Sequence, residues 1–322
     1  MSIPTTNKPT ILVTAIGSFS AQAVIDSLHD MGCRVIGCDI YPKEWVANTQ
    51  LVDVFYQAPL VRDRDQYYEM IRRVVQDEHV DFIFPLTDLE VDALNMVRDS
   101  LGATLCLSSS ETLSICRDKY RTYGFLREFV SDSVIPTERL ADCDMHSLQY
   151  PVVCKPVDGR SSCGLFKASC ESELRQHLDH IDPSRYCVQP MINGTVITVD
   201  VVRNDATRAT VCVPRKELLR TLNGAGTSVY VFRDEDLERT VHLIADKLRI
   251  HGCVNFEFIQ SDDGRFYFLE CNPRFSGGLS FTLDSGYDCV VNHLRCFTGK
   301  DIDELTNVRV GYIARKYTDY LM

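Results

Sequence analysis

The sequence lacks several features that identify common classes of protein. No apolar run approaches the length of a membrane span, and the first residues, MSIPTTNKPT, carry no charged segment followed by an apolar one. Positive charge is also scarce, because 34 Lys and Arg face 45 Asp and Glu, for a net charge of −11. We therefore expect a cytoplasmic protein whose partners are small molecules rather than nucleic acid or a membrane. The sequence leaves open whether the protein forms a homodimer.

Cysteine and histidine are present, but not with the spacing of a metal or redox site. The 14 cysteines include no C-x-x-C, and the eight histidines show no metal-ligand spacing. Several cysteines lie in apolar segments such as VVCK and TVCV, where a reduced core residue is expected. With 322 residues, 45% apolar and 25% charged, the chain is expected to form two or three packed units.

The first hundred residues alternate between strand and helix patterns. The apolar run Ile11–Gly17 predicts a buried parallel strand, and Arg34–Ile40 predicts a second one. Between them, apolar residues recur at helical spacing at Ala21, Val24, Ile25, Leu28 and Met31. The turn after the first strand lacks the full G-x-G-x-x-G pattern, so nicotinamide binding is not favoured and Asp39 is interpreted as a strand-end residue or a substrate contact. Residues 1–115 are predicted to form a Rossmann-like parallel-sheet domain.

The most informative segment is Val254–Gly278, VNFEFIQSDDGRFYFLECNPRFSGG. It predicts two strands joined by a two-residue turn at Asp263-Gly264, with one apolar and one acidic face. Opposed carboxylates repel unless a cation lies between them, and Mg²⁺ with oxygen ligands fits such a face. The alternative is a solvated face, which would ordinarily mix Lys and Thr with the acids. The predicted register pairs Glu257 with Glu270, Asn255 with Asn272, Phe256 with Cys271 and Phe258 with Leu269.

A second segment, YPVVCKPVDGRSSCG, combines a strand with a flexible loop. Its strand, Pro151–Val157, carries Lys155, and the loop that follows is rich in Gly and Ser. No Gly-Lys-Ser/Thr opens a helix here, so the segment is not a Walker A loop, and a Gly-Ser loop alone is weak support for a ligand. Together with Lys119 in CRDKY and the acidic hairpin, it predicts a nucleoside triphosphate site.

These segments together resemble the ATP-grasp superfamily, within it the small carbamoyl-phosphate-synthase-like ligases. The resemblance covers nearly the whole chain and is most specific in the Glu-x-Asn-Pro-Arg core of the hairpin, where Glu270 begins the motif. It implies an α/β and α+β fold in which an ATP-grasp domain of two α+β subdomains, 116–322, follows the N-terminal domain. Within that domain, 116–190 would be the smaller, ATP-covering subdomain and 191–322 the C-terminal subdomain.

The resemblance also implies a role for individual residues. Two lysines would hold ATP phosphates, a loop would cover them, three side chains would bind Mg²⁺ (or Mn²⁺), and an arginine would stabilise the transferred phosphoryl group. A hinge would surround adenine. These residues are Lys119 and Lys155 for the phosphates; Asp158–Gly164 for the cover, with Gly159, Ser161, Ser162 and Gly164; Glu257, Glu270 and Asn272 for the metal; Arg274 for the phosphoryl group; and Gln189, Pro190, Met191 and Ile192 for the hinge.

The sequence departs from the family pattern at the hinge. Pro190 and Val196 stand where the family commonly has glutamates, and the second of these binds ribose. Asp200 is a possible substitute, or else an exposed face residue on its strand. Arg215, in the basic segment VPRKELLR with Lys216 and Arg220, is the strongest candidate there for a catalytic role beside the acceptor carboxylate. The alternative for this segment is a charged strand edge.

The expected function is ATP-dependent ligation of a small-molecule carboxylate to an amine through an acyl phosphate, with ADP and phosphate released. Positioning and charge neutralisation suffice for this chemistry, so no protein nucleophile is required. Two alternatives stay open: a phosphotransferase acting on a small carboxylate, and a nucleotide-binding protein without turnover. Leu237, Val241, Ile244, Ala245 and Leu248 are predicted to form the buried stripe of a helix.

Overall fold

A computed structural model describes residues 8–160, 163–221 and 224–322 of the chain. The first sheet is parallel throughout, with strands in the order β3-β2-β1-β4-β5. Its order reverses direction beside β1, so the carboxyl ends of β1 and β4 border a crevice at the edge of the sheet. Its elements are β1 (Thr10–Val13), α1 (Ala21–Asp30), β2 (Arg34–Asp39), β3 (Val54–Gln57), α2 (Arg64–Glu78), β4 (Phe82–Phe84), α3 (Asp88–Met96) and β5 (Thr104–Leu105).

The predicted alternation of strands and helices is confirmed in this region. Ala21, Val24, Ile25 and Leu28 are buried on one side of α1, as their spacing requires. Met31 is the exception, because it lies just beyond the last turn of the helix and its side chain is exposed. Strand β3 was not predicted, since VFYQ is short and only partly buried.

The second sheet has six antiparallel strands in the order β14-β13-β10-β11-β12-β15. Helix α7 packs on it, and the predicted stripe of Leu237, Val241, Ile244, Ala245 and Leu248 is buried. Its elements are β10 (Gly194–Arg203), β11 (Thr210–Arg220), β12 (Gly226–Val231), α7 (Glu235–Lys247), β13 (Gly252–Ser261), β14 (Phe266–Asn272), α8 (Leu279–Asp284), α9 (Cys289–Phe297) and β15 (Gly311–Ala314).

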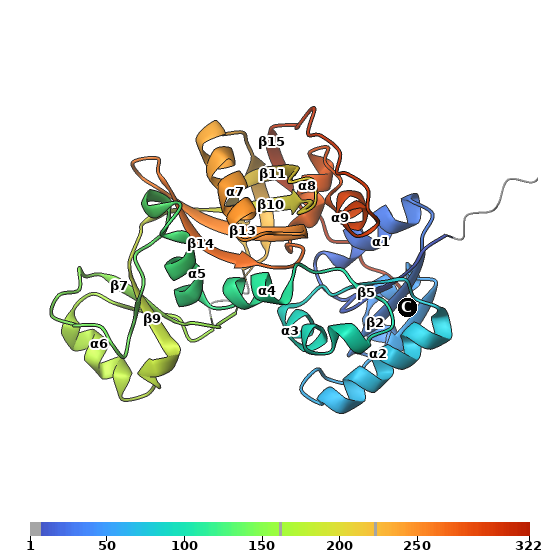
Figure 1. Cartoon of the computed structure of the whole chain (residues 1–322), viewed down its shortest axis with the longest axis horizontal. Helices are drawn as coiled ribbons and strands as arrows, with labels where there is room; N and C mark the ends of the chain where they lie inside the picture. Colours follow the sequence, from blue (N-terminus) through green and yellow to red (C-terminus); the bar gives the residue numbers. More distant parts are fainter. Residues whose placement is uncertain (1–7, 161–162, 222–223) are drawn as a thin grey trace, which may run out of the picture.

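A smaller sheet, β6-β9-β7-β8, forms a separate lobe with one helix on it. This lobe projects from the rest of the molecule, with α6, β7 and β9 at its far end (Figure 1). It is built of β6 (Glu138–Arg139), β7 (Val152–Pro156), β8 (Phe166–Ala168), α6 (Glu171–Leu178) and β9 (Tyr186–Pro190), and it is reached through α4 (Ser110–Cys116) and α5 (Lys119–Leu126). The mixed α/β and α+β class predicted for the chain is confirmed.

The acidic hairpin, β13 and β14, has the predicted pairing in its functional half only. Glu257 faces Glu270 and Asn255 faces Asn272, but Phe258 pairs with Phe268 rather than with Leu269. The two-residue turn is wrong, because Ser261 N donates to Arg265 O across a three-residue loop that ends in Gly264 with φ +88°. A β-bulge between Glu257 and Phe258 takes up the extra residue of the loop. The pairing from Asn255 to Glu257, on the side of the bulge away from the turn, therefore matches the prediction.

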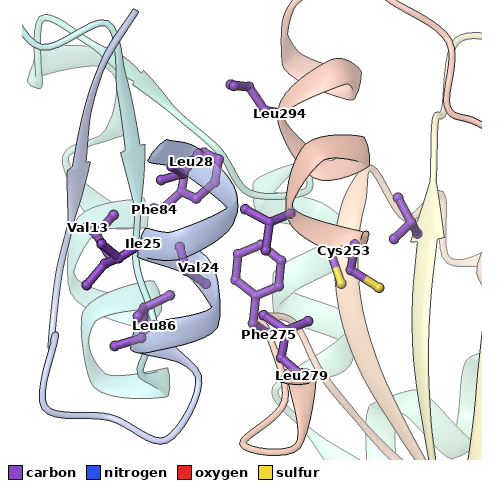
Figure 2. Close-up of a cluster of buried hydrophobic side chains, with 14 of the residues drawn as sticks. Val13, Val24, Ile25, Leu28, Phe84, Leu86, Cys253, Phe275, Leu279 and Leu294 are labelled. Atoms are coloured by element: carbon purple, nitrogen blue, oxygen red, sulfur yellow. The ribbon is translucent and has the colours of Figure 1, made fainter. Parts of the chain in front are cut away.

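One hydrophobic core joins the two large sheets. It runs from β1 and α1 to α8 and α9, and Phe84 of β4 lies 6.0 Å from Phe275, centroid to centroid (Figure 2). The small lobe has its own core, which includes Leu140 and Leu174. Residues 115–134 pack with the core of the six-stranded sheet rather than with the lobe. Boundaries at 115 and 190 remain predictions.

Candidate active site

A cavity of about 410 Å³ lies between the six-stranded sheet and the carboxyl edge of the parallel sheet. The acidic face of the β13–β14 hairpin forms one wall, and the loops that follow β1 and β4 form the other. Five side chains predicted for the site line this cavity: Arg215, Glu257, Glu270, Asn272 and Arg274. The fold therefore gathers residues that are far apart in the sequence.

The opposed carboxylates of Glu257 and Glu270 dominate the electrostatics of the cavity. Burial, and then the charge of Glu270, raise the pKa of Glu257 above its ordinary value. Burial alone would raise the pKa of Glu270 too, but the charges of Lys119 and Lys155 hold it below its ordinary value. Lys119 Nζ lies 3.2 Å from Glu270 Oε2, and Arg220 Nη2 lies 3.6 Å from Glu257 Oε2. Each acid thus has a cation beside it.

The donor set on this wall fits a hard divalent cation. Asn255 is buried opposite Asn272, and its Oδ1 has no hydrogen-bond partner among the described residues. Asn272 Nδ2 donates to Glu270 Oε1 at 3.3 Å, which leaves the amide oxygen of Asn272 as an acceptor. Carboxylate and amide oxygens are the ligands that Mg²⁺ prefers. No cluster of three or more His, Cys, Asp or Glu suited to a metal occurs within the described ranges, and the predicted ligand set has only two such residues.

The two lysines predicted to bind phosphate lie beside this acidic wall. Lys119 starts α5, and its Nζ donates to the carbonyl of Gly159 in the predicted cover loop at 2.8 Å. Lys155, on β7, is 8% exposed, and in the described part of the chain its ammonium has no hydrogen-bond or ion-pair partner. Burial lowers the pKa of Lys155, while Glu270 opposes that effect. Because this ammonium makes no hydrogen bond or ion pair among the described residues, it is available to a bound anion.

The predicted cover loop is described at its two glycines, whereas Ser161 and Ser162 lie outside the described residues. Gly164 has φ +76°, and a Cβ there would come within 3.0 Å of both Pro156 and the hydroxyl of Tyr186. The chain therefore needs glycine at this position to fold back over β7. Arg160 in the same loop forms an ion pair with Asp92 of α3, which ties the loop to the N-terminal sheet.

Arg274 is held by an acid that the sequence analysis did not select. Its Nη2 and Nε donate to Asp88 Oδ2 at 3.0 and 3.3 Å, and Nη1 donates to the carbonyl of Phe275. Burial would raise the pKa of Asp88, but Arg274 and Arg117 lower it. The sequence position of Asp88 could have identified it as a candidate site residue. It begins the helix after a buried parallel strand, where ligand-binding side chains gather.

Arg215 lies in a buried network rather than on a strand edge. Its Nη1 is 2.7 Å from Asp200 Oδ2, its Nε is 3.4 Å from Glu217 Oε1, and its Nη2 donates to Ser276 Oγ. Burial would lower the pKa of Arg215, but the two carboxylates raise it. A Cβ on Gly278 would come within 2.8 Å of the Arg215 guanidinium, so the closeness of this packing requires glycine.

This network corrects the interpretation of Asp200. The side chain of Asp200 is fully buried, accepts from the hydroxyl of Thr282 at 2.6 Å, and does not line the cavity. It is neither a ribose ligand nor an exposed face residue. The sequence could not distinguish these cases, because the partners of Asp200 lie 15 and 82 residues away. The catalytic role of Arg215 stays a prediction.

The predicted hinge lies where the small lobe joins the six-stranded sheet. Gln189 is buried and donates to Thr137 Oγ1 at 2.7 Å, and Pro190 ends β9 opposite Val152. Met191 and Ile192 follow as partly buried residues. Val196 on β10 pairs with Ile259, two residues along from the Thr198–Glu257 pair, so it lies on the same face as the acidic wall.

Comparison with known sequences finds similarity to an ATP-grasp family and to ligases. A family model described as "ATP-grasp in the biosynthetic pathway with Ter operon" matches residues 183–320. A D-alanine–D-alanine ligase of Francisella tularensis subsp. tularensis is 24% identical over 264 residues, which cover 79% of this chain and 81% of that protein. The corresponding ligase of Thermotoga petrophila is 28% identical over 236 residues, or 67% of this chain and 76% of its own.

Comparison with solved structures shows the same fold. The biotin carboxylase domain of the Hydrogenobacter thermophilus 2-oxoglutarate carboxylase, a dimer in complex with MgADP and bicarbonate, aligns with a TM-score of 0.77 and 17% identity, over 94% of this chain and 73% of that one. An N5-carboxyaminoimidazole synthetase of Staphylococcus aureus in complex with ADP aligns with a TM-score of 0.74 and 16% identity, over 94% and 80%. No helix in the described ranges is long and apolar enough to cross a membrane.

Proposed function

We propose that this chain is an ATP-grasp ligase that joins a carboxylate to an amine through an acyl phosphate, releasing ADP and phosphate. The observation that carries the proposal is the acidic pair Glu257 and Glu270, which shares one cavity with Arg274 and adjoins Lys119. That arrangement provides for a triphosphate, a divalent cation and a developing negative charge in one place.

In the proposed reaction a carboxylate oxygen attacks the γ-phosphorus, and the bond between that phosphorus and the β–γ bridging oxygen breaks, so ADP leaves. The amine nitrogen then attacks the acyl carbon, phosphate leaves with the C–O bonding electrons, and the amine loses a proton. When bound, Mg²⁺ neutralises charge on the phosphates. Lys119 and Lys155 hold the phosphate oxygens, and Arg274 stabilises the charge on the transferred group and on the acyl phosphate.

The donors assigned to Mg²⁺ are Glu257, Glu270 and Asn272, and the acceptor Asn255 Oδ1, which has no partner among the described residues, adds a further oxygen. The raised pKa of Glu257 supports this assignment, because a cation that binds the pair relieves the repulsion of Glu270. At the hinge, Gln189–Ile192 would border the adenine, and Val196 would present an apolar side chain towards the ribose.

ADP release measured with candidate acids and amines, singly and together, tests the proposed function. We expect ADP and phosphate in equal amounts only when an acid and an amine are both present with Mg²⁺ or Mn²⁺. Release with the acid alone would instead identify a phosphotransferase acting on a carboxylate. Nucleotide binding without release under any combination would identify a binding protein.

Glu270→Gln tests the metal assignment within this reaction. We expect turnover to fall by a factor of about 100 or more, because one of two anionic ligands is lost, while the melting temperature without nucleotide stays close to wild type. Asp262→Asn, in the exposed turn of the same hairpin, is the matched control and should leave turnover unchanged. Full activity in the Glu270 variant would contradict the site.

A further inference from the structure

A second, larger cavity of about 880 Å³ adjoins the candidate active site and has no role in the proposed chemistry. It lies at the carboxyl edge of the parallel sheet, lined by the loops after β1, β2 and β3 and by the start of α3. This is the point where the strand order reverses, at which open α/β sheets commonly bind ligands. Its volume lies within the range of small-molecule sites.

Apolar side chains collect around this cavity although they are open to solvent. The side chain of Trp45 is 74% exposed and that of Leu89 is 54% exposed. Exposed hydrophobic side chains that cluster in a concavity indicate a binding surface, unlike those scattered singly over a protein. The cluster consists of Ile40, Tyr41, Trp45, Leu60 and Leu89.

The rim of the cavity carries positive charge. Arg62 and Arg64 are exposed, and among the described residues neither forms an ion pair. Of the acids that line the cavity, Asp92 is paired with Arg117 and Arg160, whereas Asp39 accepts from Gly17 N and Tyr41 N and Glu90 accepts from the hydroxyl of Thr87. The two arginines at the entrance, which have no ion-pair partner among the described residues, favour a ligand with an acidic group.

The larger cavity opens onto the candidate active site. Four residues line both of them: Ser18, Thr87, Leu89 and Arg160. Thr87 immediately precedes Asp88, which holds Arg274, so the junction lies beside the arginine proposed to stabilise the transferred phosphoryl group. A molecule seated in the larger cavity can thus reach the reacting atoms.

We propose that the larger cavity binds the bulky apolar body of the acid-bearing substrate, whose reacting group enters the site beside Arg274. The inference rests on the proposed ligase function for the reaction, and on the two cavities for the substrate class. Alanine-sized acids would leave most of the apolar wall uncovered, so the substrate carries a larger aliphatic or aromatic group. Its apolar surface leaves water when it covers Trp45, Leu60 and Leu89.

Trp45 is the single tryptophan of the chain, so its fluorescence reports directly on this cavity. Phenylalanine, leucine and alanine serve as probes, because each carries a carboxylate and an amine while their side chains differ in bulk. In the presence of Mg²⁺ and a non-hydrolysable ATP analogue, phenylalanine and leucine should produce a saturable change. Half-saturation should come at a concentration about tenfold lower than for alanine, or lower still.

Ala47→Phe fills the cavity from an exposed position outside the proposed catalytic set, and it should raise half-saturation for phenylalanine about tenfold with ADP affinity unchanged. Ala206→Phe, in an exposed turn away from both cavities, is the matched control. The proposal is overturned if Trp45 fluorescence does not change with phenylalanine or leucine, or if alanine changes it at the same concentrations. So does a signal that follows protein concentration alone, which would indicate that a second copy covers the cavity.

The two proposals can fail separately, because fluorescence requires no turnover. If the bulky probes bind but no acid and amine together release ADP, the ligase function is wrong while the cavity stands. The opposite result is ADP release that requires an acid and an amine, while the size of the acid's side chain affects neither the Trp45 fluorescence titration nor KM. In that case the ligase function stands and the cavity assignment is wrong.

Discussion

At the scale of single residues, the site consists of charges that determine one another's protonation. Glu257 carries a raised pKa and Glu270 a lowered one, although the two face each other across the hairpin. The difference arises because Lys119 contacts Glu270 while Arg220 contacts Glu257 only at 3.6 Å. Protonation at low pH therefore reaches Glu257 first, and we expect metal binding to weaken as the pH falls through its raised pKa.

Lys155 and Arg274 should separate binding from chemistry. Lys155→Met is expected to weaken ATP binding about 10- to 100-fold, since a charge-assisted contact is lost. Arg274→Ala should mainly reduce kcat, by about 100-fold or more. Calorimetry together with steady-state kinetics measures both quantities. Equal losses of affinity in the two variants would contradict these roles.

Glu90 predicts a dependence of stability on pH. Burial raises its pKa from 4.5 to about 7, so the folded state retains a proton that the unfolded state loses. Its contribution to stability is complete below about pH 4.5 and is lost as the pH rises through about 7. Glu90→Gln should remove this dependence of the free energy of unfolding on pH. At pH 8 the variant should be more stable than wild type by about 3 kcal/mol. Urea unfolding at several pH values tests this against Glu44→Gln, an exposed control.

At the scale of elements, the start of α3 and the end of β14 form one unit. Asp88 is the first residue of α3 and holds Arg274, two residues beyond β14, while Asp92 one turn later holds Arg160 and Arg117. One helix of the N-terminal sheet thus positions both the predicted catalytic arginine and the predicted cover loop. Movement of α3 would alter both at once.

Asp88→Asn tests this positioning. The guanidinium of Arg274 would lose its anionic partner, so we expect kcat to fall about tenfold with little change in KM for ATP. Asp65→Asn is the matched control, since it also removes a carboxylate from the first turn of a helix, α2, but lies exposed. A change in melting temperature with kcat unaltered would make Asp88 purely structural.

At the scale of the whole molecule, the parallel sheet and the six-stranded sheet share one core, whereas the small lobe has its own. Figure 2 shows Val24, Leu28 and Phe84 of the first region facing Phe275, Leu279 and Leu294 of the second. The cavity between the sheets therefore has rigid walls on two sides. The small lobe, which carries Lys155, packs around a core of its own.

Phe275→Ala tests this division. We expect a loss of about 3–5 kcal/mol in the free energy of unfolding. Probes in both large sheets should report the same loss, because the two sheets unfold together. Leu174→Ala in the lobe should instead lower protection against hydrogen exchange mainly in residues 138–190. Separate unfolding of the two large sheets in the Phe275 variant would contradict a shared core.

The sequence by itself determined the alternating N-terminal elements and the acidic register of the hairpin, whereas the fold class of the rest of the chain was implied by the family resemblance. These follow from local periodicity: apolar spacing selects helices and strands, and alternation along β13 and β14 places Glu257, Glu270 and both asparagines on one face. Even so, the register was right only because a longer turn and a bulge offset each other, and local propensity does not resolve such a pair of irregularities.

The tertiary structure alone decided which charges meet. Asp200 and Arg215 neutralise each other, Asp88 reaches Arg274 across 186 residues, and the larger cavity forms where three loops of the parallel sheet converge. Contacts of this kind depend on how the sheets pack and on which polar groups burial forces together, and no periodicity along the chain encodes them. Whether a charged residue binds a ligand or stabilises the fold is settled by its partners in space.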